Sequence, residues 1–151
     1  MQYKTYSHCA GLEEVSPALR QEIITAINAI VVQPAKGAAP QVRVEFLDSI
    51  KESGWSDEVP VAESSDITIT SIKNGVGLCL QTGNMSRMYA DLVKLQTLYL
   101  NNSIKAAVYV LPSNPVAKQL GDNIAEATRL ERELKIFKKA YHVPTVVFSL
   151  E

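Results

Sequence analysis

The most constraining feature of this chain is a change of hydrophobic period in its middle. Over residues 66–72 polar and apolar side chains alternate, which is the two-residue repeat of a β-strand. Asn74-Gly75 follows, and Asn-Gly is the dipeptide that a tight hairpin turn prefers. The return strand, at about residues 76–82, is apolar on one face and carries Cys79 and Gln81 on the other. If the polar faces of both strands lie on the same side of the hairpin, Thr70 lies near these two side chains.

Helical periods flank this hairpin. Ser16-Pro17 and the apolar residues after it, spaced by three and four, predict a helix over about 17–31. The same spacing predicts further helices over about 42–53, 85–101 and 124–137. Short apolar runs at 104–111 and 143–150 predict buried strands, and two prolines in 33–40 predict a surface loop. This order predicts a single domain, residues 1–151, of the α/β class, with a mixed β-sheet flanked by helices.

Composition and charge disfavour several classes of protein. With 46% hydrophobic residues the 151-residue chain can bury a core, and 15 basic against 16 acidic residues give no global attraction to nucleic acid. Two cysteines without CxxC spacing favour a reduced, cytoplasmic protein over a zinc or disulfide protein. The N-terminus lacks the apolar run of a signal peptide, and no segment is apolar enough to span a bilayer, so we expect no membrane partner.

Several short motifs follow one another over most of the chain. They are Ser53-Gly54-Trp55, Ile72-Lys73-Asn74-Gly75-Val76, Gln81-Thr82-Gly83-Asn84, the segment 89–96, Gly121-Asp122-Asn123-Ile124-Ala125 and the segment 129–134. In this order and spacing the chain resembles the BglII/BamHI-like branch of the PD-(D/E)xK restriction endonucleases. The resemblance implies a restriction-endonuclease-like core, a homodimer, DNA as the partner and Mg²⁺ as the cofactor of an active member.

The resemblance also assigns the active-site positions. Members of this family hold Mg²⁺ with an aspartate on the first hairpin strand and a glutamate on the second, two residues before a Gln or Glu. These positions fall on Thr70, Cys79 and Gln81. A thiol is a soft ligand and a hydroxyl carries no charge, so both are poor ligands for Mg²⁺, which prefers hard oxygen donors. The sequence therefore predicts a degenerate active site and a catalytically impaired or inactive nuclease fold that retains dimerisation and DNA binding.

Two alternatives remain open. An active Mg²⁺-dependent endonuclease requires relocated carboxylates, and Asp66, Asp91 and Glu45 are the candidates. Asp66 is the candidate metal ligand because it shares the strand face of Thr70, but it lies about 13 Å away at roughly 3.3 Å per residue, a distance that requires a rearrangement of the strand. The second alternative is an interaction or regulatory protein that does not bind DNA.

Basic side chains beside the hairpin are the candidate DNA contacts. Lys73 lies in the hairpin turn, and Arg87 and Lys94 lie on the following helix. Lysine and arginine neutralise phosphates, and a local cluster acts even when the net charge is close to zero. The mixed charges on the last helix are typical of a solvated face. His8 is expected in an unpartnered N-terminal tail, and Cys79 has no base nearby that would make it a nucleophile.

Overall fold

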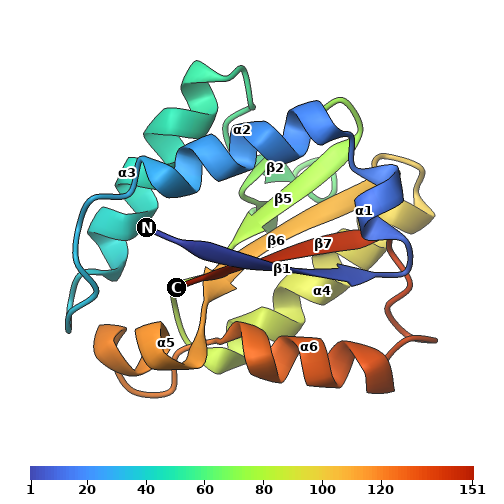
Figure 1. The fold of residues 1–151 in the computed structure, drawn as a ribbon. Coiled ribbons are helices and arrows are strands. Elements are labelled where there is room, and N and C mark those ends of the chain that lie inside the picture. The colour runs from blue at the N-terminus through green and yellow to red at the C-terminus, as the bar shows by residue number, and fades with distance from the viewer.

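The computed structural model describes residues 1–151, and Figure 1 shows the arrangement of the helices and strands. In chain order they are β1 (Tyr3–His8), α1 (Gly11–Glu14), α2 (Pro17–Asn28), α3 (Ala39–Glu52), β2 (Val59–Pro60), β3 (Thr68–Ile69), β4 (Ser71–Lys73), β5 (Val76–Leu80), α4 (Met85–Leu100), β6 (Ala106–Pro112), α5 (Asn114–Leu120), α6 (Ala127–Ile136) and β7 (Thr145–Leu150).

A five-stranded mixed sheet forms the centre, with the strand order β1-β7-β6-β5-β4. Strands β5, β6 and β7 run parallel, while the edge strands β1 and β4 are antiparallel to their neighbours. A separate two-stranded ribbon joins β2 and β3. The prediction of an α/β fold with a mixed sheet is therefore confirmed.

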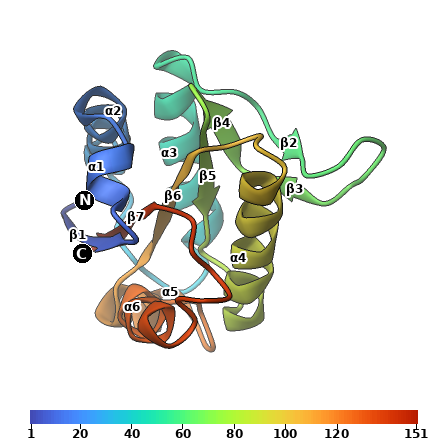
Figure 2. The same cartoon turned by 90° about the vertical axis from the view of Figure 1, so that its right-hand side faces the viewer.

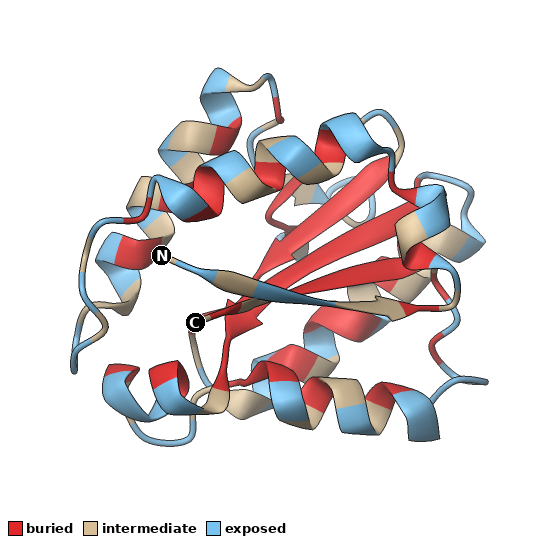
Figure 3. Ribbon diagram, in the orientation of Figure 1, coloured by how far each residue is buried: buried red, intermediate tan, exposed pale blue.

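Helices cover both faces of the sheet (Figure 2). Alternate residues of the central strands contribute to two cores, one under α2 and α3 and the other under α4 and α6. Every residue of β6 is buried because both of its faces are covered, which explains its unbroken apolar run. Figure 3 shows the same pattern, with buried central strands and helices that are buried along one side only.

The hairpin has the predicted turn. Asn74 and Gly75 have φ angles of 49° and 74°, the positive values that a two-residue hairpin turn requires at both central positions. The first predicted strand, however, is interrupted. Residues 68–69 pair with β2 and residues 71–73 pair with β5, so Thr70 lies at the break between two short strands.

The N-terminal segment is the main correction to the sequence analysis. The segment expected to be a tail is β1, which pairs with β7 along its whole length. His8 is buried there, its ring stacks on Tyr141, and its Nε2 lies 2.8 Å from the Tyr141 carbonyl oxygen. Because a carbonyl only accepts hydrogen bonds, Nε2 carries the proton. The short helix α5 was also not predicted.

None of the helices has the length and the apolar composition that crossing a membrane requires.

Candidate functional site

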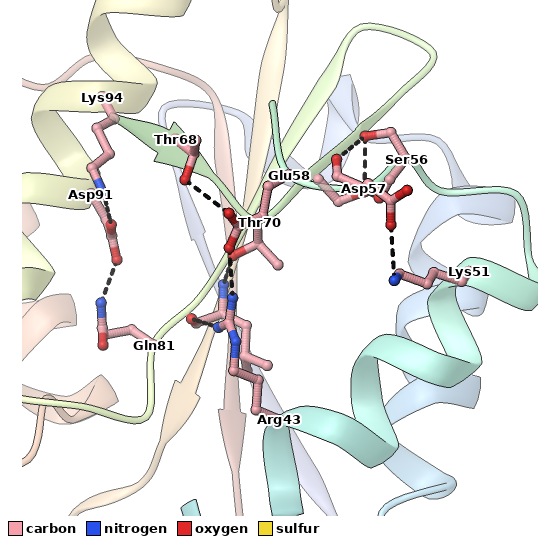
Figure 4. Close-up of polar contacts among 12 residues, drawn as sticks. Arg43, Lys51, Ser56, Asp57, Glu58, Thr68, Thr70, Gln81, Asp91 and Lys94 are labelled. Atoms are coloured by element: carbon pink, nitrogen blue, oxygen red, sulfur yellow. Dashed lines mark hydrogen bonds and ion pairs between the residues drawn. The ribbon is translucent and has the colours of Figure 1, made fainter. Parts of the chain in front are cut away.

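A cleft of about 480 Å³ opens beyond the carboxyl end of β5, beside the start of α4. Its walls come from segments far apart in sequence, and they include Arg43 of α3, Glu58 next to β2, Gln81 after β5, and Arg87 and Asp91 of α4. Ligands of open α/β sheets bind outside the carboxyl ends of the strands. Figure 4 shows how Arg43, Glu58, Gln81 and Asp91 lie in this region, which gathers polar side chains from three layers of the fold.

Thr70 contributes a structural hydrogen bond at this cleft. Its hydroxyl oxygen accepts the backbone N–H of Leu80 at 3.0 Å, and the residue is only 9% exposed. Regular pairing between β4 and β5 ends before Thr70, so its side chain supplies an acceptor where the interrupted strand does not. The hydroxyl therefore fixes the last residue of β5 against the neighbouring chain.

Cys79 is buried in the core below the cleft. The side chain packs among the residues under α4, is 1% exposed and is not part of the cleft wall. Burial raises the pKa of the Cys79 thiol well above its usual range; the charge of Asp91 adds to this rise, and the charges of Lys94 and Arg43 oppose it. The thiol is consequently neutral at pH 7, which disfavours both nucleophilic attack and metal ligation.

Gln81 belongs to a buried polar network. Its Nε2 donates to Oδ2 of Asp91 at 2.7 Å, and its Oε1 accepts the N–H of Gly83 at 3.0 Å. Asp91 also accepts the Tyr109 hydroxyl at 3.1 Å and pairs with Nζ of Lys94 at 3.1 Å. Burial, followed by the charge of Asp91, raises the pKa of Tyr109 well above its ordinary value. The network is fully paired, with Lys94 as the counterion of Asp91.

Two arginines carry the remaining positive charge of the cleft. Nη1 of Arg43 donates to the Leu80 carbonyl oxygen at 3.1 Å, and its Nη2 lies 3.7 Å from Oε1 of Glu58. Arg87 lines the cleft with an exposed side chain, and none of the ion pairs in the chain involves it. An unpaired arginine beside a second arginine is suited to bind an anion.

Comparison with known proteins agrees with this architecture. Residues 3–150 match the family described as restriction endonuclease BglII/BglIII. The chain belongs to this restriction endonuclease family. It is similar to restriction endonuclease BglII complexed with a DNA 16-mer, with a TM-score of 0.86 and 13% identity over 99% of this chain and 76% of BglII. Free BglII gives a TM-score of 0.72 and 14% identity over 100% of this chain and 80% of BglII. No curated protein matches the sequence at a significant level.

The three positions that the sequence analysis assigned to the family motif fall in different environments. Thr70 and Gln81 line the cleft, whereas Cys79 lies beneath it. Of the predicted DNA contacts, Arg87 lines the cleft and Lys94 lies behind it, paired with Asp91.

Lys73 lies outside the cleft. It is opposite Val76, at the start of β5, whereas the cleft opens past the end of that strand. Its Nζ pairs with Oε1 of Glu22 at 2.7 Å, and Oε2 of the same carboxylate accepts Nε1 of Trp55 at 2.8 Å. The lysine therefore ties the hairpin to α2, and its charge is already paired.

The candidate relocated carboxylates do not converge. Asp66 is exposed in the loop between β2 and β3 and does not line the cleft. Glu45 accepts the N–H groups of Val31 and Val32 at 2.8 and 3.1 Å, so it holds the loop that follows α2. Of the three candidates only Asp91 reaches the cleft.

The side chains of the cleft do not fit the Mg²⁺ ion of a BglII-type active site. No group of three or more His, Cys, Asp or Glu side chains could hold a metal ion. The two carboxylates at the cleft, Glu58 and Asp91, are paired with Arg43 and Lys94. Mg²⁺ needs hard, charged oxygen ligands in a near-octahedral arrangement, and a hydroxyl and a buried thiol do not supply them.

The sequence analysis missed Arg43 and Glu58. Arg43 lies 37 residues before Leu80, the residue whose carbonyl oxygen it binds, and no local pattern in the sequence connects the two positions. The only available signal was the charge of each side chain.

Proposed function

We propose that this protein binds the DNA backbone at the cleft and does not hydrolyse it with Mg²⁺. The observation that carries the proposal is the state of the two motif positions. Thr70 uses its hydroxyl to hold β5, and Cys79 is a buried, neutral thiol. Paired carboxylates would otherwise hold the metal ions that activate water and stabilise the phosphoryl charge, so their replacement removes the main source of rate in this chemistry.

The positive groups of the cleft support the DNA-binding part. Arg87 has no ion-pair partner, and Arg43 pairs with an exposed carboxylate at 3.7 Å, a distance at which the attraction is weak. Arginine recognises phosphate with parallel hydrogen bonds, and a local cluster suffices despite a net charge of −1. The similar BglII structure is described as complexed with DNA, which favours the same class of partner here.

The test combines a cleavage assay with a binding assay. Purified protein is incubated with supercoiled plasmid and Mg²⁺ or Mn²⁺, and binding to a labelled duplex is followed by fluorescence anisotropy. We expect salt-dependent binding without cleavage. Glu58→Gln and Asp91→Asn remove the two carboxylates that line the cleft and serve as controls. Cleavage that is lost in either variant would establish a relocated active site, and absence of binding would favour the interaction or regulatory alternative.

We also propose a homodimer that forms through the exposed face of α4. An apolar groove of about 350 Å³ runs between α4 and the residues after α6. Val93, Leu100 and Phe137 line it and are 67%, 64% and 39% exposed. Contiguous exposed apolar side chains commonly mark protein interfaces, and most homodimers use one self-complementary patch.

Sedimentation velocity in the micromolar range tests the dimer. A Val93→Asp/Leu100→Asp variant should sediment as a monomer because two charges enter the proposed interface. Val44→Asp is the matched control, since Val44 is 49% exposed on α3, away from the groove. A monomeric parent protein, or a variant that stays dimeric, would refute this interface.

A further inference from the structure

Arg43 occupies a distinctive point of the cleft. The carbonyl that accepts its Nη1 belongs to Leu80, the residue between the motif positions Cys79 and Gln81. The N–H of Leu80 is in turn bonded to Thr70, the third motif position. The guanidinium is therefore hydrogen-bonded to Leu80, which is flanked by Cys79 and Gln81 and bonded to Thr70. These three residues occupy the positions at which relatives assemble their metal site.

The guanidinium keeps hydrogen-bonding capacity at this point. Arginine has five N–H donors and stays charged at every physiological pH. One donor is used by the Leu80 carbonyl, and Oε1 of Glu58 lies 3.7 Å from Nη2, beyond hydrogen-bonding distance. The Glu58 side chain is 63% exposed, and its other oxygen, Oε2, accepts a long hydrogen bond of 3.4 Å from the Thr68 hydroxyl. In Figure 4 the Arg43 side chain extends from α3 toward Thr70 and Glu58.

The charges around the cleft leave a positive excess. Asp91 is neutralised by Lys94 and bound by two further donors, so it does not compete for Arg43. Glu58 offsets one of the two remaining arginines, and Arg87 is unpaired. The hydroxyl of Thr70 in the cleft wall and the thiol of Cys79 beneath it are neutral. An anion that displaces Glu58 therefore meets two guanidinium groups, and Glu58 is the only carboxylate in the wall that it leaves without a cationic partner.

We propose that the guanidinium of Arg43 replaces the divalent cation at this position and makes the cleft a metal-independent site for a phosphodiester group. The inference rests on the proposed function, because it names the group of DNA that the cleft holds and the side chain that holds it. Arg87 contributes the second positive charge. Glu58 acts as the competing internal anion that an incoming phosphate displaces.

Anisotropy titrations with a labelled duplex, in EDTA and in Mg²⁺ at matched ionic strength, test this assignment. We expect equal affinity in both buffers. Arg43→Ala should weaken binding about tenfold, a change of about 1.4 kcal/mol, because it removes a charge-assisted contact to phosphate. It should also reduce the slope of log K against log salt by about 0.9, the value for one lost phosphate contact. Glu58→Gln should strengthen binding, because it removes the competing carboxylate.

Two further variants separate a phosphate contact from a folding defect. Arg43→Lys keeps the charge and should retain part of the affinity, while Lys139→Ala removes an exposed charge beyond α6 and should change nothing. Binding that requires Mg²⁺, or a salt slope unchanged in Arg43→Ala, would overturn the role of Arg43 while the proposed DNA binding stands.

Inorganic phosphate separates the failure of this inference from the failure of DNA binding. The amide resonances of Leu80, Gln81 and Gly83 are followed by NMR during a phosphate titration in EDTA. Shifts in the parent protein that vanish in Arg43→Ala would support the anion site even if no duplex binds. If neither phosphate nor duplex binds, both the site and the proposed function are refuted.

Discussion

Thr70 gives a prediction that separates a structural role from metal ligation. Its hydroxyl is the acceptor for the buried N–H of Leu80, and the residue is 9% exposed. Thr70→Val keeps the shape of the side chain and leaves that donor without a partner. An unsatisfied buried donor costs about 1–3 kcal/mol. In a chain of this length each kcal/mol lowers Tm by about 2–4 °C, so a loss of about 2 kcal/mol corresponds to roughly 4–8 °C.

Urea denaturation followed by circular dichroism measures this loss directly. The midpoint should fall in Thr70→Val while the m-value is unchanged, because the surface exposed on unfolding is the same. Thr70→Ser retains the oxygen and is the matched control, which should lose clearly less stability. If Thr70→Val is as stable as Thr70→Ser, the hydroxyl does not hold β5 and the structural reading of this position is incorrect.

Three further predictions concern groups outside the cleft. Glu22→Ala should lower stability by about 1–3 kcal/mol in denaturant titrations, since it removes the partner of both Lys73 and Trp55. Burial lowers the pKa of His8 below 6.5, so the unfolded chain binds the proton more readily; stability should be constant above pH 6.5 and fall below it, and His8→Gln should flatten that fall. In native protein Cys79 should not react with a thiol reagent, and reaction should begin only with unfolding; fast labelling of both cysteines would contradict its burial.

The elements that sequence predicted best were those with strong local signals. The hairpin was predicted because Asn74-Gly75 fixes its turn, and α2 because Ser16 caps it by accepting the N–H of Leu19. Strand β1 was missed because half-exposed and exposed residues mix along it, and only pairing with β7 stabilises it. That pairing joins the two ends of the chain, and no local pattern reports such a contact.

The candidate site was only partly accessible from sequence. Strand alternation and the family motif led to Thr70 and Gln81, which do meet at the cleft. Lys73 was predicted as a DNA contact, but it pairs with Val76 at the start of β5, about 16 Å from Gln81 at roughly 3.3 Å per residue. Arg43 was not readable, since its position depends on how α3 packs against the sheet.

The side chains of Thr70 and Cys79 are neutral, and a substitution of Thr70 tests whether this neutrality favours the binding of an anion. Thr70→Asp introduces a carboxylate at the position that the family resemblance assigns to the first metal ligand, and it still offers an oxygen to Leu80 N–H. The new charge would lie beside Arg43 and pair with it, which removes the donors that we assign to phosphate.

We therefore expect Thr70→Asp to stay folded, to bind duplex DNA about tenfold more weakly in EDTA, and to gain no cleavage in Mg²⁺, because Cys79 still supplies no second carboxylate. Thr70→Asn is the uncharged control, and anisotropy and plasmid assays on both variants measure the difference. Unchanged DNA affinity in Thr70→Asp would mean that Arg43 does not contact phosphate. Metal-dependent cleavage would mean that one carboxylate suffices to rebuild the site. The expected result, weaker binding without cleavage, follows if the positive charge of Arg43 and the neutral side chains of Thr70 and Cys79 together hold an anion.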